Sequence, residues 1–481
     1  MSIRGGITPE VLLCFALLLI IYLVGKPQLA DAQAPELTAE QVEILQEEAQ
    51  EQEKPSPPEE EPEEVPIEIP ELWPIVTSPV PATTLEVGPM TGVLAPYGYP
   101  AALDTLTRGW RFHRLGPVRV TPFFEYNTIY RSNIYQTYAA KKADWVHNFN
   151  PGLKLELPLA HRHLISLGYL GDYFIFSHND QDSHYDHNLN ADAAINLRGG
   201  LSLRFGSTYR SATEERTSTT GRQRRYERLG PNFEIAYNRA DLWRLQGNYQ
   251  LDLLDFEDNI DQRDNRQDHT GGITLDYKFW PKTALLAQYI IQRREYPDAP
   301  RGNSLSHTPF LGVTWDPTAK LSGTIKFGYT MKEYDTGLPE RDNHPSSWAM
   351  SIQTLYRYSR YTWLTLISQR STQEDLDFSN NAYDNTAFYV TWHHDWHYFK
   401  TESYLAFYYN NNSYLNATLE PFTGLAKQRE DNIISLGGGL SRPFTPYLKF
   451  RLDYHYLTRD SNFNTYSYNE HRFLAGMEAS F

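Results

Sequence analysis

Cysteine is almost absent from this chain: its 481 residues include a single one, Cys14. Cys14 lies in an apolar run at 11–24 that follows Arg4 and precedes the small residues of "LADAQA". A basic start, a short apolar core and small residues are typical of a secretory signal peptide, so we place cleavage after Ala32. An uncleaved anchor helix is the alternative. Loss of residues 1–32 would leave no cysteine, which excludes disulfides and thiol chemistry.

Catalytic and nucleotide-binding motifs are also lacking. The chain has neither a G-x-S-x-G nucleophile elbow nor an H-E-x-x-H zinc helix. We therefore expect a protein that is not an enzyme, that needs no cofactor and that has no nucleic-acid partner. A hydrolase built into a barrel wall stays open as an alternative, because the residues of such a site need not be close in sequence.

Metal-binding patterns are weak. "HHDWH" at 393–397 is predicted on a tight turn, where adjacent side chains diverge and cannot reach one ion. The acidic stretches at 177–187 and 256–268 lack the glycine spacing of an EF-hand loop. We predict that both stretches are solvated loops and that the protein has no metal site.

Basic residues are scarce in one segment where acidic residues are dense. Residues 33–90 hold 15 Glu and one Lys, without Asp or Arg, whereas the whole chain has a net charge of −15. Closely spaced prolines in this segment oppose both helix and sheet. We predict a disordered, acidic, Pro/Glu-rich periplasmic tail at 33–90, either a flexible linker or a docking segment for a periplasmic partner. Residues 91–117 follow as a connecting segment that could fold into a lumen as a constriction.

From about residue 118 onward the chain repeats one unit: an alternating run, a short turn, another alternating run and a long polar segment, of which 409–430 is one. The repeat is typical of transmembrane β-hairpins, with short periplasmic turns and longer outer loops. Two strands per turn and one at each end predict about 18 strands (16 to 20), the first at 118–128 and the last from near 466 to 481. The short turns are "PLAH" at 158, "RGG" at 198, "NRAD" at 238, "WPKT" at 280, "DPTAK" at 316, "RYSR" at 357, "HHDW" at 393 and "RPFTP" at 442.

The alternation has a period of two within the runs. In residues 321–332, for example, Ile325 and Phe327 share one face and Lys326 and Thr330 the other. A soluble β-sandwich would also alternate. The 34 Tyr of the chain and the aromatic residues at most strand ends favour lipid interfaces instead. The predicted fold class is all-β: a transmembrane antiparallel β-barrel at 118–481 in the cell outer membrane of a Gram-negative bacterium.

The chain ends on an alternating segment, in which Phe473, Ala475, Met477, Ala479 and Phe481 share one face. A closed barrel needs its last strand to pair with its first. A terminal aromatic with this spacing also resembles the signal that the barrel assembly machinery of the outer membrane reads. We therefore expect Phe481 and Phe473 to act as an assembly signal and the outer face of the strand to contact outer-membrane lipid.

Two stretches resemble a known family. "SNIY" at 132–135, within 119–135, and Pro-Gly-Leu at 151–153, within 144–157, are similar to the opening hairpin of outer-membrane β-barrel porins associated with exopolysaccharide synthesis loci. The resemblance implies a transport role, with a polysaccharide as cargo to be exported. It supplies no catalytic residue.

The inward-facing positions are predicted to be polar and charged, with both signs present. About 18 strands leave a bore wide enough for water. We therefore expect a porin-like conduit for passive transport, with export of a polysaccharide and uptake of small solutes both open. A non-conducting structural or adhesive anchor is the rival interpretation. The pore-lining residues that we expect are Arg204, Arg244, Lys278, Lys326, Lys449, Arg451, Asp453, Arg472 and Glu478.

Overall fold

The structure is a computed structural model that describes residues 113–480 except 161, 218–220, 240–241, 300–301, 319, 337–341, 375–381, 421–423 and 425. The predicted signal peptide at 1–32, the acidic tail at 33–90 and Phe481 lie outside the described residues.

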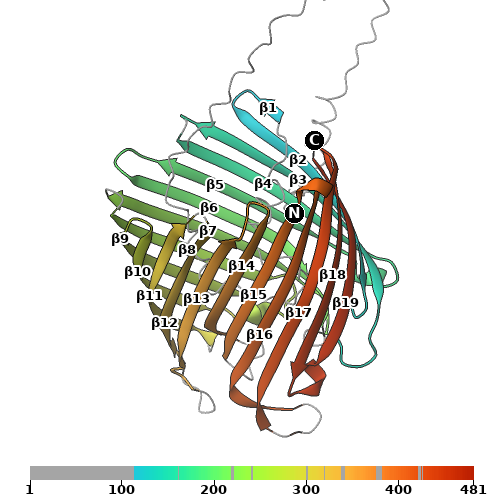
Figure 1. Cartoon of the computed structure of the whole chain (residues 1–481). Coiled ribbons are helices and arrows are strands. Elements are labelled where there is room, and N and C mark those ends of the chain that lie inside the picture. Colours follow the sequence, from blue (N-terminus) through green and yellow to red (C-terminus); the bar gives the residue numbers. More distant parts are fainter. Residues whose placement is uncertain are drawn as a thin grey trace, which may run out of the picture. The chain divides into compact units, whose positions relative to one another are not determined.

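The described residues form one antiparallel sheet in which each strand pairs with its neighbours in chain order (Figure 1). The first long strand, β2, also pairs with the last, β19, over nine positions from Phe123↔Ser480 to Arg131↔Arg472. This pairing closes strands β2 to β19 into a barrel of 18 strands, as predicted. The strands and the short 3-10 helices are β1 (His113–Leu115), β2 (Val118–Arg131), β3 (Asp144–Leu159), β4 (His163–Phe176), η2 (Asp180–Asp182), β5 (His184–Asn196), β6 (Leu201–Glu214), β7 (Arg224–Arg239), β8 (Trp243–Phe256), η3 (Gln262–Asp264), β9 (Arg266–Trp280), β10 (Thr283–Glu295), β11 (Ser304–Thr318), β12 (Leu321–Tyr334), β13 (Ser346–Arg357), β14 (Thr362–Gln373), β15 (Tyr383–Trp396), η5 (His397–Phe399), β16 (Thr401–Leu419), β17 (Ala426–Thr445), β18 (Leu448–Ser461), η6 (Asn464–Tyr466) and β19 (Tyr468–Ser480).

Apolar side chains of the barrel are exposed and polar ones are buried, which is the reverse of the distribution in a soluble protein. Large apolar side chains on the outer face are exposed, such as Leu311 (72%) and Ile273 (60%), whereas Lys326 on the inner face is only 3% exposed. An outer face of this kind requires an apolar solvent, so the soluble sandwich is excluded. Among the described residues no α-helix is long and apolar enough to cross a membrane.

The short turns all lie at one end of the barrel and the longer connections at the other. In the turn between β5 and β6, Gly199 and Gly200 have φ of +82° and +85°, a region that other residues rarely adopt. A Cβ on Gly200 would also lie 2.1 Å from the backbone oxygen of Asn238. Glycine is therefore required at position 200 for two reasons, the positive φ and the lack of space for a Cβ. We call the two ends the short-turn end and the long-loop end.

A short strand precedes the barrel that the sequence predicted to begin at 118. β1 pairs with the start of β2, with His113 opposite Val120 and Leu115 opposite Val118. β19 reaches only to Phe123 along the same edge of β2. β1 therefore continues the line of β19 along β2. Within the predicted connecting segment at 91–117, residues 113–115 thus form a strand along β2, and residues 91–112 lie outside the described residues, so the lumen constriction stays a prediction.

Two other expectations about local structure are wrong. "HHDW" belongs to strand β15, and the turn follows at His397–Phe399 and Lys400, which has a φ of +48°. The segment 409–430 is not one long loop, because β16 runs to Leu419 and β17 begins at Ala426. Its polar residues belong to β16 and β17, which pair with each other and are longer than the other strands. A strand can carry polar side chains on both faces where it extends beyond the lipid.

Candidate functional site

The inner face of the barrel is the candidate site. The register of neighbouring strands brings all nine predicted lining residues to this face: Arg204 lies opposite Glu234, Arg244 opposite Asp276, Lys449 opposite Glu478 and Arg472 opposite His455, for example. Arg244, Lys326, Asp453, Arg472 and Glu478 are buried against neighbouring side chains. The other four, Arg204, Lys278, Lys449 and Arg451, are half-buried.

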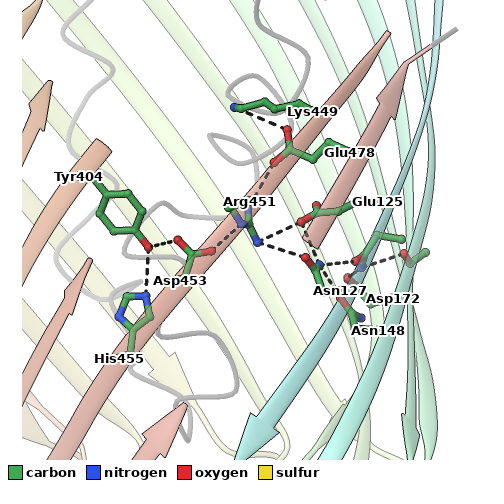
Figure 2. Close-up of polar contacts among 12 residues, drawn as sticks. Glu125, Asn127, Asn148, Asp172, Tyr404, Lys449, Arg451, Asp453, His455 and Glu478 are labelled. Carbon is green, nitrogen blue, oxygen red and sulfur yellow. Dashed lines mark hydrogen bonds and ion pairs between the residues drawn. The ribbon is translucent and has the colours of Figure 1, made fainter. Parts of the chain in front are cut away.

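A network of charges joins the first and last strands of the barrel, and we call it the seam network (Figure 2). The Arg451 guanidinium on β18 lies 3.1 Å from Glu125 Oε1 on β2, 2.7 Å from Asp453 Oδ2 and 3.4 Å from Glu478 Oε1 on β19. Lys449 Nζ lies 3.7 Å from Glu478 Oε2. Two cations therefore face three carboxylates across the strand pair that closes the barrel. A planar guanidinium with five donors suits several carboxylates at once, as an ammonium would not.

The seam network continues along β16 and β18. The Tyr404 hydroxyl donates to Asp453 Oδ1 (2.6 Å) and lies 3.1 Å from His455 Nε2 (Figure 2). Between these strands, β17 carries glycines where their side chains meet. A Cβ on Gly439 would lie 1.9 Å from Asp453 Oδ1, and one on Gly437 would lie 2.0 Å from His455 Nδ1. The glycine run at 437–439 therefore lets side chains from β16 and β18 meet across β17.

On its other side the network passes into a row of amides. Asn127 Nδ2 donates to Glu125 Oε1 (2.9 Å), and Arg451 donates to Asn127 Oδ1 (3.4 Å). Asn150 and Asn188, from β3 and β5, both donate to Asp172 on β4, the latter at 3.2 Å. Side chains on the inner face are thus linked to one another by hydrogen bonds and ion pairs from β16 round to β5.

The opposite wall holds Lys326. Its Nζ donates to Gln288 Oε1 (2.7 Å) and lies 4.8 Å from the centre of the Phe310 ring. Gln288 in turn donates to Thr274 Oγ1 (3.0 Å). This cation is therefore held by an amide and a ring, whereas Arg451 is held by carboxylates.

At the long-loop end, Glu374 follows β14 and reaches back to the inner wall of β10 to β12. Its carboxylate forms ion pairs with Lys332 and with Arg294 (3.4 Å), and accepts hydrogen bonds from Tyr296 (2.7 Å) and Ser304 (2.8 Å). Burial alone would raise the pKa of Glu374, but the two cations outweigh it and lower the pKa to about 2. We call this group of contacts the Glu374 clamp.

A second set of loop contacts covers the inner wall at the same end. Arg131 on β2 forms ion pairs with Glu215, which follows β6, and with Glu470 on β19, both at 2.7 Å. Ile134 and Tyr135, which follow β2, pack against Val146 and Phe176 of the inner face, together with Ile129 and Phe174. Burial, with a hydrogen bond to Asp182, raises the pKa of Tyr135 to about 12. The loops after β2 and β6 therefore bend over the lumen.

The sequence did not identify Arg131, Glu215, Glu374 or Glu470. They stand at strand ends or in loops, where charged residues are common and no pattern marks the few that turn inward. The glycine run in β17 was the one available signal for the contacts of Tyr404 with Asp453 and His455, since glycine inside a strand often marks a close approach.

The remaining predicted residues lie elsewhere. Phe473 is on the outer face, 51% exposed, with its ring centre 4.7 Å from that of Tyr454. In "HHDWH", His393 faces inward and His394 outward, because successive residues of a strand alternate. The acidic stretches are partly paired: Asp182 with Tyr135, and Asp264 with Arg224. In the described part of the chain no group of three His, Cys, Asp or Glu could hold a metal ion.

Residues 113–481 match the family model described as "Putative beta-barrel porin 2". No curated protein sequence matches the chain. Solved structures of several outer-membrane proteins are similar to it. They include the outer membrane protein OpdK of Pseudomonas aeruginosa (12% identity over 75% of this chain and 99% of that chain, TM-score 0.42), OccAB4 of Acinetobacter baumannii (12% identity, 76% and 99%, TM-score 0.41) and a bacterial polysaccharide outer membrane secretin (9% identity, 75% and 98%, TM-score 0.33).

Proposed function

The chain belongs to the family described as "Putative beta-barrel porin 2", and from this premise we propose that it is a passive conduit through the outer membrane. The protein is a porin-like outer-membrane barrel. Barrels of this kind place short turns in the periplasm and long loops outside, which sets the orientation of the conduit.

The observation that carries this proposal is the inner wall. Barrels of about 16 to 18 strands leave an aqueous channel. Here the wall presents charged and amide side chains that bond to one another around the barrel, such as Arg451 with Glu125 and Asn150 with Asp172. A wall of polar groups favours water over a dry core, and mixed charge favours a channel without strong ion selectivity.

A hydroxyl-rich cargo fits one part of this wall best. On the inner faces of β15 and β16, Asn385 donates to Asn410 Oδ1 (3.0 Å) and to Asn412 Oδ1 (2.7 Å), and the rings of Tyr383 and Tyr414 lie 5.0 Å apart. Amides can donate to and accept from sugar hydroxyls. We therefore favour a polysaccharide as the cargo and export as its direction. Uptake of small solutes is the alternative.

Single-channel recording tests the proposal. The full chain and a variant without residues 33–112 are inserted in planar bilayers; the deletion stops before β1, which pairs with β2. Stepwise openings of the full chain, interrupted when a neutral polysaccharide is added, are expected. Openings only after the deletion would assign a plug to residues 33–112, and silence of both proteins would leave the non-conducting anchor.

A further inference from the structure

A ring of tyrosines encircles the outer face near the middle of the strands. Eight of the nine even-numbered strands carry one, and the ninth, β14, has Arg370 in its place. We call this ring the tyrosine girdle, and its members are Tyr126, Tyr169, Tyr209, Tyr249, Tyr289, Tyr329, Tyr409 and Tyr454. Aromatic residues at a membrane interface are expected. The partners of their hydroxyls are the unexpected part.

Every girdle hydroxyl bonds to a side chain of the next strand in one diagonal geometry. Tyr249, for example, lies opposite Gly271 and bonds to His269, two residues nearer the long loop. In five of the eight cases the partner is the Nδ1 atom of a histidine. These pairs are Tyr126–His147 (2.9 Å), Tyr169–His187 (3.0 Å), Tyr249–His269 (2.8 Å), Tyr289–His307 (2.6 Å) and Tyr454–His471 (2.9 Å).

The five histidines share one place on their strands. Each is the fourth residue of β3, β5, β9, β11 or β19, and each is half-buried or exposed. The next outer-face residue towards the short-turn end is Phe149, Leu189, Gly271, Pro309 or Phe473. On β9, Gln267 lies on the loop side of His269, and exposed Ile273 lies beyond Gly271 on the other side. The residue on the loop side is also polar on β19 (Asn469), but it is aromatic on β3 and β5 (Trp145 and Tyr185) and apolar on β11 (Leu305). The imidazoles therefore stand among polar and aromatic side chains, as expected at the depth of lipid headgroups.

The tyrosine contact leaves one ring nitrogen for other partners. When the hydroxyl donates to Nδ1, the neutral ring carries its proton on Nε2, and the charged ring carries a proton on both nitrogens. Nε2 is thus a donor in either state, and within the described residues it has no hydrogen bond in these five histidines. A fixed N–H donor at this depth matches an anionic oxygen.

We propose that the five Tyr–His pairs bind the phosphate groups of outer-leaflet lipids, one lipid at each of five hairpins. The pairs lie on separate hairpins, and Arg293 on β10 stands opposite one of them, at His269. A free phosphate would gain only such polar contacts. A lipid gains both the N–H donor and the adjoining apolar wall, such as Ile273 and Leu275 below His269. The proposal rests on the membrane location and is independent of conduction.

The chain supplies its own control residues. In the same diagonal geometry Tyr209 bonds to Glu227 (3.0 Å), Tyr329 to Ser346 (2.9 Å) and Tyr409 to Asn432 (2.9 Å). Asparagine therefore already serves as the hydroxyl partner at one girdle position. Replacement of a girdle histidine by Asn is expected to keep the tyrosine contact and to remove the imidazole.

The test measures which lipids surround the full-length protein. The wild type and a variant with His→Asn at 147, 187, 269, 307 and 471 are reconstituted in brominated phosphatidylcholine mixed with phosphatidic acid or, as a control, with diacylglycerol. Recovery of tryptophan fluorescence then gives the relative affinity for the unbrominated lipid. The wild type is expected to prefer phosphatidic acid about threefold, the range of an exposed charge contact, and the variant not at all.

Two further variants keep the result decisive. Asn432→His adds a sixth pair and is expected to raise the preference, while His269→Asn with His307→Asn lowers it in part if the fivefold variant does not fold. Equal thermal unfolding in phosphatidylcholine shows that folding is intact. An unchanged preference in folded variants overturns the proposal. Loss of the preference on adding inorganic phosphate would assign the imidazoles to free anions and overturn it as well.

Discussion

At the scale of single residues, the lumen is a set of charges that neutralise one another. Arg451 is the clearest case, because one guanidinium contacts Glu125, Asp453 and Glu478. The side chains of these carboxylates are at most 9% exposed, while Arg451 itself is 20% exposed. The negative charge of these carboxylates is therefore neutralised by the guanidinium more than by water. Removal of Arg451 would leave the seam network with a net negative charge.

Arg451→Gln is expected to make the conduit more selective for cations and to destabilise the barrel by about 3 kcal/mol, since it leaves buried carboxylates without their cation. The reversal potential under a KCl gradient measures the first effect and thermal unfolding the second. Arg451→Lys keeps the charge and is the matched control. A reversal potential that is unchanged in Arg451→Gln would show that ions do not pass this network.

At the scale of elements, the strands form a uniform wall and the loops of the long-loop end narrow it. The Glu374 clamp joins the segment after β14 to β10, β11 and β12. A carboxylate whose folded-state pKa is depressed to about 2 contributes stability that is present above its ordinary pKa, and that is lost as the pH falls through the depressed value. The clamp is therefore intact at all pH values above about 5.

Glu374→Gln is expected to release this segment at neutral pH, because Arg294 and Lys332 lose their shared carboxylate. Faster proteolysis of the segment after β14 and noisier single-channel currents are the expected results, with a loss of about 3 kcal/mol in the free energy of unfolding. Glu333→Gln, on the outer face of β12, is the matched control. Wild-type behaviour of Glu374→Gln from neutral pH down to about 5 would show that the clamp does not hold the loop.

At the scale of the whole molecule, charge is divided unevenly between two parts. Residues 33–90 carry almost all of the net charge of −15, and they share no alternation with the barrel. The barrel closes through β2 and β19 without them. Each of strands β2 to β19 pairs with a strand on both sides, so we expect assembly to need only the described strands.

Deletion of residues 33–112 should leave a protein that inserts in the outer membrane and resists SDS at room temperature, because β1 to β19 are all retained. Electrophoretic mobility with and without heating measures this. A barrel that fails to assemble would show that the tail does more than link. Loss of transport with normal assembly would instead support the periplasmic docking role.

The sequence by itself determined the local features of the barrel. Alternation of period two specifies a strand and its two faces, so that Lys326 and Phe327 must point in opposite directions in any register. The spacing of short turns then sets the number of strands, and an even number returns the chain to the side on which it began. These features depend only on neighbouring residues, which is why the 18 strands were predictable.

The tertiary structure decided which side chains meet. Glu125 and Arg451 are far apart in the chain and meet only because β2 pairs with β19. Glu374, directly after β14, reaches across β13 to Lys332 on β12 and Arg294 on β10, a contact that no alternation encodes. The diagonal from Tyr249 to His269 depends on the register between two strands, and a shift by one residue would turn the histidine into the lumen. Strand pairing and register are non-local properties. The seam network, the Glu374 clamp and the Tyr–His pairs therefore form only in the closed barrel.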